Sequence, residues 1–145
     1  MKKQISTKDA NTLLEKYKII LTKQDTASTD EKLVYLNNEP VFFYYEKELY
    51  PTLKYLLNHP ILKNITVDMG AIKFVINGAD IMRPGIVVID ANIEKHEAVM
   101  IIDQNNKKPL AVGIALFSSE EMQKVSSGKV VKNIHYVGDE LWKNG

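Results

Sequence analysis

The stretch that decides the fold is Val67–Ile86, VDMGAIKFVINGADIMRPGI. Three glycines, Gly70, Gly78 and Gly85, fall at the boundaries of its expected elements. Glycine adopts positive φ at no steric cost and lets another chain come close to the backbone, so glycines at this spacing indicate tight turns. The stretch therefore predicts a strand, a turn, a short helix, a second turn, and a Pro-Gly corner that enters another strand.

The composition is that of an ordinary globular protein. The 145 residues are 45% hydrophobic and 26% charged, which suits one domain or two small ones. No apolar run approaches the roughly 18 residues that span a membrane, and the basic N-terminus lacks the apolar segment of a signal peptide. Cysteine is absent, which excludes disulfides, thiolate zinc sites and cysteine nucleophiles. We therefore expect a cytoplasmic protein with no membrane partner.

The net charge limits how the chain could bind nucleic acid. It is +1, from 19 basic against 18 acidic residues. Nonspecific nucleic-acid binders usually carry a clear positive excess, because neutralisation of phosphates drives their affinity. Binding of RNA must therefore rely on a local patch and on shape. Arg83 is the only arginine, so lysine supplies the remaining positive charge as a point charge rather than a bidentate fork.

The first half of the chain predicts a small α/β unit. Ser6 is expected to cap the first helix, and Pro51 suits the first turn of the second. The expected elements, in order, are a helix over Thr7–Lys18, a loop over Thr22–Glu31, strands over Lys32–Leu36 and Val41–Tyr45 around an Asn37–Pro40 turn, and an amphipathic helix over Glu48–Asn58.

The second half is dominated by β structure. Strands are expected over Ile86–Asp90, Ala98–Ile102, Leu110–Phe117 and Lys129–Tyr136, with a short helix that Ser118–Glu121 begins and Gly128 ends. Short strands at this spacing suggest a compact barrel. The expected fold class is therefore α/β (α+β), with a small α/β domain over 1–65 and a barrel over 66–145. The short apolar link Ile61–Ile65 is unlike a flexible tether, so we expect the two halves to pack firmly.

The pattern V-D-x-G-A, then G-A, then P-G-I resembles the opening of a PUA domain, a small RNA-binding β-barrel module. The tail Asn133–Tyr136 with Asp139–Trp142, and Ala111–Gly113 with Ser118–Glu121, are similar to the malignant T-cell-amplified-sequence family. That family, like the N-terminal part of the translation initiation factor 2D family, pairs a "pre-PUA" α/β domain with a PUA domain. In the first half Tyr50–Leu53, before a short helix, carries the resemblance. The lack of cysteine favours an archaeal-type member.

The resemblance implies a noncatalytic role in translation: initiation, reinitiation or ribosome recycling. It implies RNA partners, tRNA or rRNA, and contact with the small ribosomal subunit, and it leaves a protein partner open. Two alternatives remain. One is an accessory RNA-binding module for RNA modification, and the other is a protein-interaction scaffold.

The resemblance also places RNA against the first helix of the PUA domain and the neighbouring strands. The candidate RNA-binding residues are Gly70, Ala71, Lys73, Arg83, Pro84, Gly85, His135 and Tyr136. Gly70 and Ala71 open the helix, where free N–H groups point outward. Lys73 and Arg83 are expected on one face as phosphate ligands, and His135 and Tyr136 offer flat rings for stacking.

Structural roles stay open for each candidate: turn formation for the glycines, solvation for Lys73, barrel closure for Tyr136 and burial for His135. Phe74 is expected in the core, and Trp142 is expected to pack the C-terminus onto the barrel. An enzyme is not expected. The histidines His59, His96 and His135 are scattered without metal-ligand spacing, and the sequence carries no nucleophile-elbow or P-loop motif. We therefore expect no catalytic residue, metal or cofactor.

Overall fold

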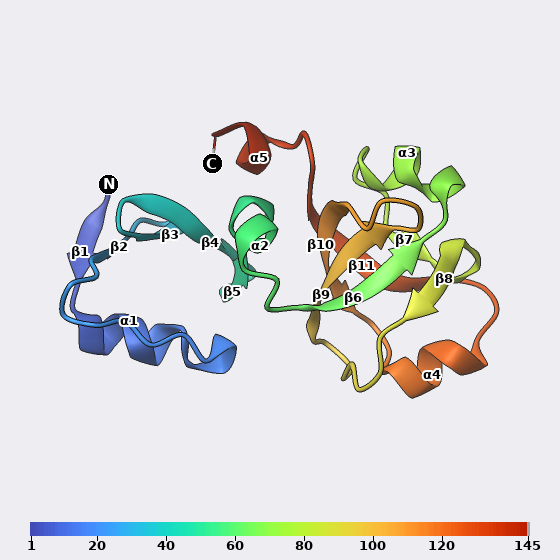
Figure 1. Ribbon diagram of the computed structural model, residues 1–145, viewed down its shortest axis with the longest axis horizontal. Helices are drawn as coiled ribbons and strands as arrows, with labels where there is room; N and C mark the ends of the chain where they lie inside the picture. Colours follow the sequence, from blue (N-terminus) through green and yellow to red (C-terminus); the bar gives the residue numbers. More distant parts are fainter. Residues whose placement is uncertain (145) are drawn as a thin grey trace.

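The computed structural model describes residues 1–144 as two lobes placed side by side (Figure 1). The elements of the first lobe are β1 (Lys3–Ile5), α1 (Thr7–Leu13), η1 (Glu15–Tyr17), β2 (Ala27–Thr29), β3 (Leu33–Leu36), β4 (Glu39–Tyr45), β5 (Glu48–Pro51) and α2 (Leu53–Asn58). The elements of the second are β6 (Lys63–Val67), η2 (Met69–Ala71), α3 (Ile72–Val75), β7 (Ile81–Met82), η3 (Arg83–Gly85), β8 (Ile86–Ile89), β9 (Ala98–Asp103), β10 (Pro109–Ala115), α4 (Ser119–Lys124), β11 (Lys129–Tyr136) and α5 (Glu140–Asn144).

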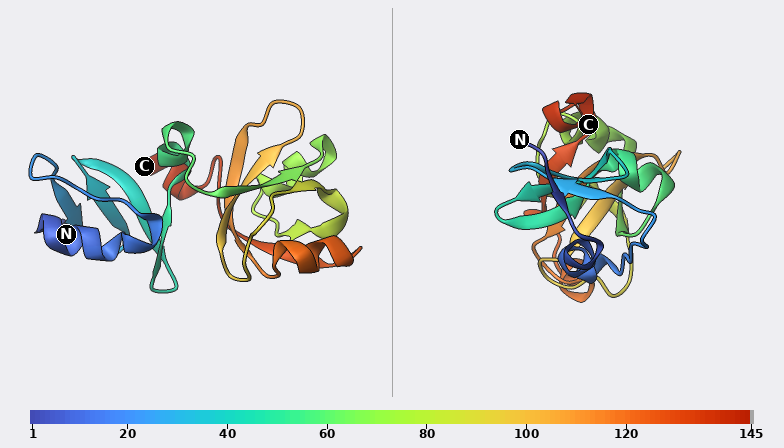
Figure 2. Two further views of the ribbon diagram at one scale, coloured as in Figure 1. Left: turned by 60° about the horizontal axis from the view of Figure 1, so that its bottom comes forward. Right: turned by 90° about the vertical axis from the view of Figure 1, so that its left-hand side faces the viewer.

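Each lobe is built on its own sheet. The first sheet is an antiparallel meander of five strands in the order β1-β2-β3-β4-β5. The second has six strands in the order β7-β11-β10-β9-β6-β8, and its β6–β9 pair is parallel. This second sheet curls into a half-barrel, with α3 and α4 on opposite sides of it (Figures 1 and 2). The expected α/β (α+β) class is confirmed.

The helix cap and the hairpin turn expected in the first lobe are both present. The Ser6 hydroxyl accepts a hydrogen bond from the Asp9 N–H at 3.0 Å and begins α1. The β3–β4 turn has positive φ at Asn37 (51°) and Asn38 (68°), which asparagine tolerates and which matches the twist of a two-residue hairpin.

Two expectations for the first lobe are wrong. The supposed loop Thr22–Glu31 contains strand β2, which pairs with β1 and β3. Glu48–Asn58 is not one helix. Its first part is β5, paired with β4, and α2 begins only after Thr52, whose hydroxyl accepts from the Tyr55 N–H at 3.2 Å. Pro51 therefore ends a strand rather than opening a helix, because proline pushes the residue before it toward extended backbone.

The stretch Val67–Ile86 forms the expected elements in the expected order, and it adds a strand that the pattern did not predict, β7, which pairs with β11. β6 leads into η2 and α3, and η3 is the Pro-Gly corner that enters β8. Gly78 has the positive φ, 89°, that its turn requires. The same expectation is wrong for Gly70 and Gly85, because neither adopts positive φ. These two glycines are therefore not needed for an unusual backbone conformation, and what they provide is the absence of a side chain at these positions.

The lobes share a hydrophobic core at their seam. Phe43, Tyr50, Leu53 and Leu56 of the first lobe pack in one cluster with Ala98, Met100, Ile102 and Val112 of the second. Each of these side chains is buried. The expected boundary between residues 65 and 66 falls inside β6, which begins at Lys63 and belongs to the second sheet. The halves thus meet through an apolar interface rather than through a tether.

Candidate nucleic-acid interface

A groove of about 760 Å³ opens in the second lobe between α3, β7 and η3. Four of the expected RNA-binding residues line it: Gly70, Ala71, Pro84 and Gly85. Asp80 and Lys129 also line it and form an ion pair at 3.3 Å. The stretch that decides the fold therefore also builds the walls of this groove.

Small residues keep the floor of the groove open. Asp68 ties its two sides together, because its carboxylate accepts from the Ala71 N–H at 2.9 Å while its own N–H donates to the Gly85 carbonyl at 2.9 Å. A Cβ built on Gly85 would lie 3.4 Å from the Ala71 Cβ, and one on Gly70 would lie 3.4 Å from Asp68 Oδ1. Both are ordinary contacts, so the glycines leave open space above the backbone without demanding unusual torsions.

Two residues of β11, Asn133 and Tyr136, contact the turn that follows α3. A Cβ on Gly78 would lie 3.0 Å from Cε1 of Tyr136, so this glycine admits the half-buried tyrosine ring beneath the turn. The Asn133 amide donates to the carbonyls of Val75 and Ala79, each at 3.0 Å, and the Asn133 N–H donates to Asp80 at 2.9 Å. Tyr136 and Asn133 therefore position the groove wall. No local pattern predicts this role for Asn133, because the carbonyls that its amide contacts lie 58 and 54 positions away in the chain.

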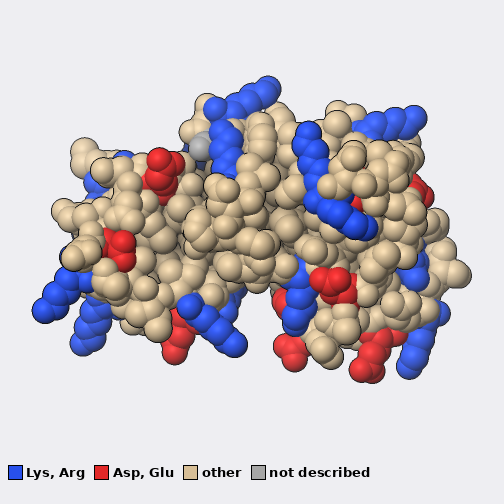
Figure 3. Space-filling view, viewed as in Figure 1, with Lys and Arg blue, Asp and Glu red and all other residues tan. Residues whose placement is uncertain are grey.

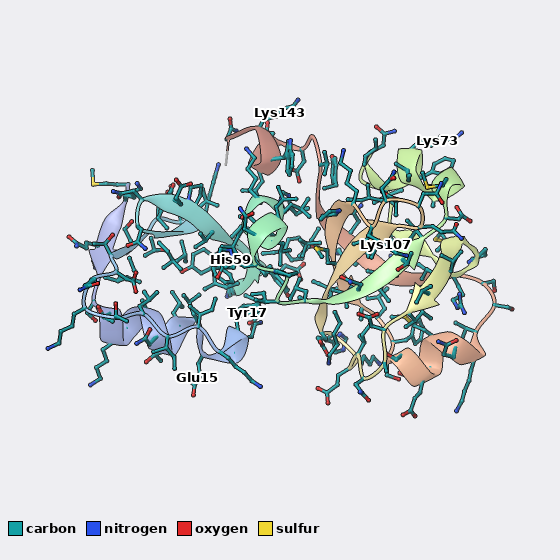
Figure 4. The ribbon with its side chains drawn as sticks, viewed as in Figure 1. Glu15, Tyr17, His59, Lys73, Lys107 and Lys143 are labelled. Carbon is teal, nitrogen blue, oxygen red and sulfur yellow. The ribbon has the colours of Figure 1, made fainter. Side chains whose placement is uncertain are left out.

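An aromatic ring and a lysine stand beside the groove. Phe74 lines it and is 58% exposed, so the expectation that Phe74 belongs to the core is wrong. The single turn of α3 buries Val75 and leaves Phe74 outside. The Lys73 Nζ lies 5.2 Å from the centroid of the Phe74 ring, and Lys73 projects outward from α3 (Figure 4). Together they offer a flat face and a positive charge.

Arg83 points elsewhere. Its Nε–H donates to the Met122 carbonyl at 2.7 Å, and Nη1 donates to the Ile86 carbonyl at 3.3 Å. Met122 belongs to α4, on the side of the barrel opposite α3 (Figure 1). Lys73 and Arg83 therefore do not form a shared positive patch. Arg83 fastens the Pro-Gly corner to α4.

His135 cannot stack on a base, so that expectation is wrong. The side chain is 1% exposed. Its Nε2 accepts from the Leu53 N–H at 3.1 Å, and its Nδ1 lies 2.8 Å from Oδ2 of Asp139. A backbone N–H can only donate, so Nε2 is unprotonated and Nδ1 carries the hydrogen that Asp139 accepts. Burial lowers the pKa of His135, which agrees with this neutral form.

In residues 1–144 no group of three or more His, Cys, Asp or Glu side chains could hold a metal ion. No helix in that range is long and apolar enough to cross a membrane.

The groove and the half-barrel that carries it define a class of protein. Residues 63–137 match the PUA domain, and residues 1–59 match a domain of unknown function, DUF1947. The chain is a PUA-domain protein with a second, N-terminal domain. Within that class it is similar to malignant T-cell-amplified sequence 1 and translation machinery-associated protein 20.

Relatives of the chain occur in both archaea and eukaryotes. The chain is 48% identical to an uncharacterized protein of Methanocaldococcus jannaschii over 120 residues, which are 81% of this chain and 74% of that protein. It is 38% identical over 116 residues to malignant T-cell-amplified sequence 1 of Danio rerio, covering 77% of this chain and 64% of the relative. It is 36% identical over 114 residues to translation machinery-associated protein 20 of Schizosaccharomyces pombe, covering 74% and 63%. The chain thus spans slightly less than two thirds of these eukaryotic relatives.

Two solved structures match nearly the whole chain, and a third matches part of it. A hypothetical protein of Pyrococcus horikoshii superposes with a TM-score of 0.83 at 28% identity, over 99% of both chains. A conserved PUA domain protein of Thermoplasma acidophilum gives 0.80 at 28% identity, again over 99% of both. A chain of an archaeal box H/ACA sRNP complex gives 0.53 at 30% identity, over 66% of this chain and 30% of that one.

Proposed function

We propose that this is a noncatalytic RNA-binding protein of the cytoplasm that acts in translation, and that the α3 groove receives tRNA or rRNA. The main support for RNA binding is the groove itself. Its floor is formed by Gly70, Ala71 and Gly85, and the exposed ring of Phe74 and the ammonium of Lys73 lie beside it. Membership of the PUA family and the names of the translation-associated relatives support the proposal.

The groove suits unpaired nucleotides better than a duplex. It is lined mainly by apolar and small residues, so it can accept the faces of bases while the backbone runs across Gly70 and Gly85. Proteins that recognise RNA by sequence mostly take single-stranded loops and ends, whose bases can splay out and stack. Stacking on one aromatic side chain contributes about 1–3 kcal/mol per base. The unpaired end or a loop of a structured RNA is therefore the substrate class, and contact with the small ribosomal subunit would follow from binding its rRNA.

Phe74 gives the direct test of RNA binding by this groove. The affinity of a fluorescently labelled single-stranded RNA should fall about tenfold in Phe74→Ala, the lower part of the stacking range. Ile20→Ala is the matched control, since Ile20 is an apolar side chain that is 81% exposed in the first lobe. If wild type and Phe74→Ala bound the RNA with equal affinity, the result would contradict RNA binding in this groove.

The likeness to part of a box H/ACA sRNP favours a second candidate, an accessory module for RNA modification. Crosslinking in the native cell, with sequencing of the bound RNA, separates the two. Recovery of tRNA and small-subunit rRNA with ribosomal fractions supports the translation role. Recovery of guide RNAs would favour the accessory role. A protein that crosslinks to no RNA would be a scaffold.

A further inference from the structure

A second surface lies along the same edge of the molecule as α3. α2, which closes the first lobe, and α5, which ends the second, approach each other at the seam, and α3 lies along the same edge (Figures 1 and 2). Lys143 of α5 and Lys73 of α3 both project from this edge (Figure 4). A strand of RNA that leaves the groove along this edge would meet α5 and α2.

The first feature of this surface is a contact between Lys54 of α2 and Trp142 of α5. The Lys54 Nζ lies 5.3 Å from the centroid of the indole ring, within the range of a cation–π interaction. The backbone N–H of Trp142 donates to Asp139 Oδ1 at 2.8 Å, and the other oxygen of Asp139 accepts from His135 Nδ1 at 2.8 Å. The backbone of Trp142 is therefore held by the same carboxylate that fixes the buried histidine of the seam.

A stacked pair of rings joins Tyr55, the residue after Lys54 in α2, to His59, the residue that follows the helix. Tyr55 and His59 are parallel within 8°, with centroids 4.3 Å apart, and His59 Nδ1 lies 3.2 Å from the Tyr55 carbonyl. His59 is exposed and Tyr55 half-buried. The outer ring of the pair thus presents a flat face whose orientation is already fixed.

The charge of this surface is positive. Lys54 and Lys143 are exposed, and within residues 1–144 neither takes part in an ion pair. On the face shown in Figure 3, lysine side chains gather above α2 and α5. Glu140 is the acidic residue of α5. Exposed lysines interleaved with ring faces are the combination by which proteins hold single-stranded nucleic acid, the cations on the phosphates and the rings under the bases.

We propose that this α2–α5 surface, made by Lys54, Tyr55, His59, Trp142 and Lys143, binds the continuation of the single-stranded RNA held in the α3 groove. The inference rests on the proposed function and adds to it a second subsite that spans both lobes. Because the shared core at the seam fixes the lobes, the two subsites act as linked binding sites whose combined affinity exceeds that of either alone.

Two labelled single-stranded RNAs test this, one of about 4 nucleotides and one of about 16, the range of site sizes for small barrel domains. In Lys54→Gln/Lys143→Gln the affinity for the longer RNA should fall about tenfold at moderate salt. The slope of log affinity against log salt should fall by about 1.4, two phosphates at roughly 0.7 each. The shorter RNA, which fills only the groove, should bind as it does to wild type.

The matched control is Lys8→Gln/Lys124→Gln, which removes one exposed lysine from each lobe, in α1 and α4, on the opposite edge of the molecule from α5 (Figure 1). It should leave both affinities unchanged. Trp142 is the only tryptophan of the chain, so its fluorescence reports on the surface directly. At concentrations near each dissociation constant, the longer RNA should quench the emission and the shorter should not.

The outcomes separate this inference from the proposed function. Unchanged affinity and salt slope for the longer RNA in the double variant, with no quenching, would overturn the second subsite and leave the groove in place. Equal losses for both RNAs would overturn it as well, because the lysines would then act at the groove. Failure of both RNAs to bind the wild-type protein would overturn both proposals.

Discussion

The backbone N–H of Leu53 donates to Nε2 of His135 at 3.1 Å, joining residues 82 positions apart in the chain. Leu53 begins α2 in the first lobe, and His135 lies on β11 in the second. Phe43 packs edge-on against the imidazole, with ring centroids 5.2 Å apart. The seam between the lobes is therefore closed by a buried, neutral histidine that acts as a hydrogen-bond acceptor.

This relationship predicts a dependence of stability on pH. Burial lowers the pKa of His135 from its ordinary 6.5. Between the lowered value and 6.5 the unfolded chain binds a proton that the folded chain does not. The His135 contribution to the free energy of unfolding should therefore be complete above pH 6.5 and decrease as the pH falls below it.

Urea denaturation from pH 8 to pH 5 measures this contribution when wild type is compared with His135→Gln. The glutamine carbonyl can still accept from the Leu53 N–H but does not titrate. His59→Gln, a change at an exposed histidine, is the control. Parallel pH profiles for wild type and His135→Gln would contradict the assignment.

The shared core predicts that the lobes unfold together. Leu56 is 1% exposed and packs in the seam cluster, whereas its neighbour Leu57 is 52% exposed. Leu56→Ala should lower the free energy of unfolding by about 2–5 kcal/mol, and Leu57→Ala should change it little. The wild-type chain should show one transition in thermal or urea unfolding. Separately expressed lobes that are as stable as the intact chain would contradict a common core.

The turn after α3 predicts a difference between two glycines. Gly78 and Gly128 have nearly equal φ, 89° and 88°, so alanine pays a similar backbone penalty of about 1–2 kcal/mol at each. Only at Gly78 does the new Cβ also meet a ring, that of Tyr136 at 3.0 Å, while nothing lies within 4 Å at Gly128. Gly78→Ala should therefore be the more destabilising change in urea denaturation. If both variants lost the same free energy of unfolding, the Tyr136 ring would have moved away from the new Cβ at no cost.

Local signals predicted much of the fold because they act within a few residues. The serine caps at Ser6 and Ser118 and the order of elements in Val67–Ile86 are of this kind. β11 has the expected bounds, Lys129–Tyr136. Strand β5 was missed because the leucines of Glu48–Asn58 also fit a helix, and only pairing with β4 decides between the two.

The candidate site was predictable only in part, for the same reason. Gly70 with Ala71, and Pro84 with Gly85, line the groove as two pairs of adjacent residues within the stretch Val67–Ile86. The surroundings of His135 and Arg83 depend on distant partners, Leu53 and Met122, which no local pattern reveals. The exposure of Phe74 follows from which face of a one-turn helix meets the barrel, and four residues carry too little periodicity to show it.

The central claim is that RNA binds in the groove between α3, β7 and η3. A titration of the ¹⁵N-labelled protein with a single-stranded RNA, followed through its backbone amide resonances, tests this residue by residue. The account predicts that the amides of Gly70, Ala71, Phe74 and Gly85 shift most, while that of Gly128, outside the groove lining, stays in place. RNA that binds with its largest shifts elsewhere, leaving those four amides unmoved, would contradict it.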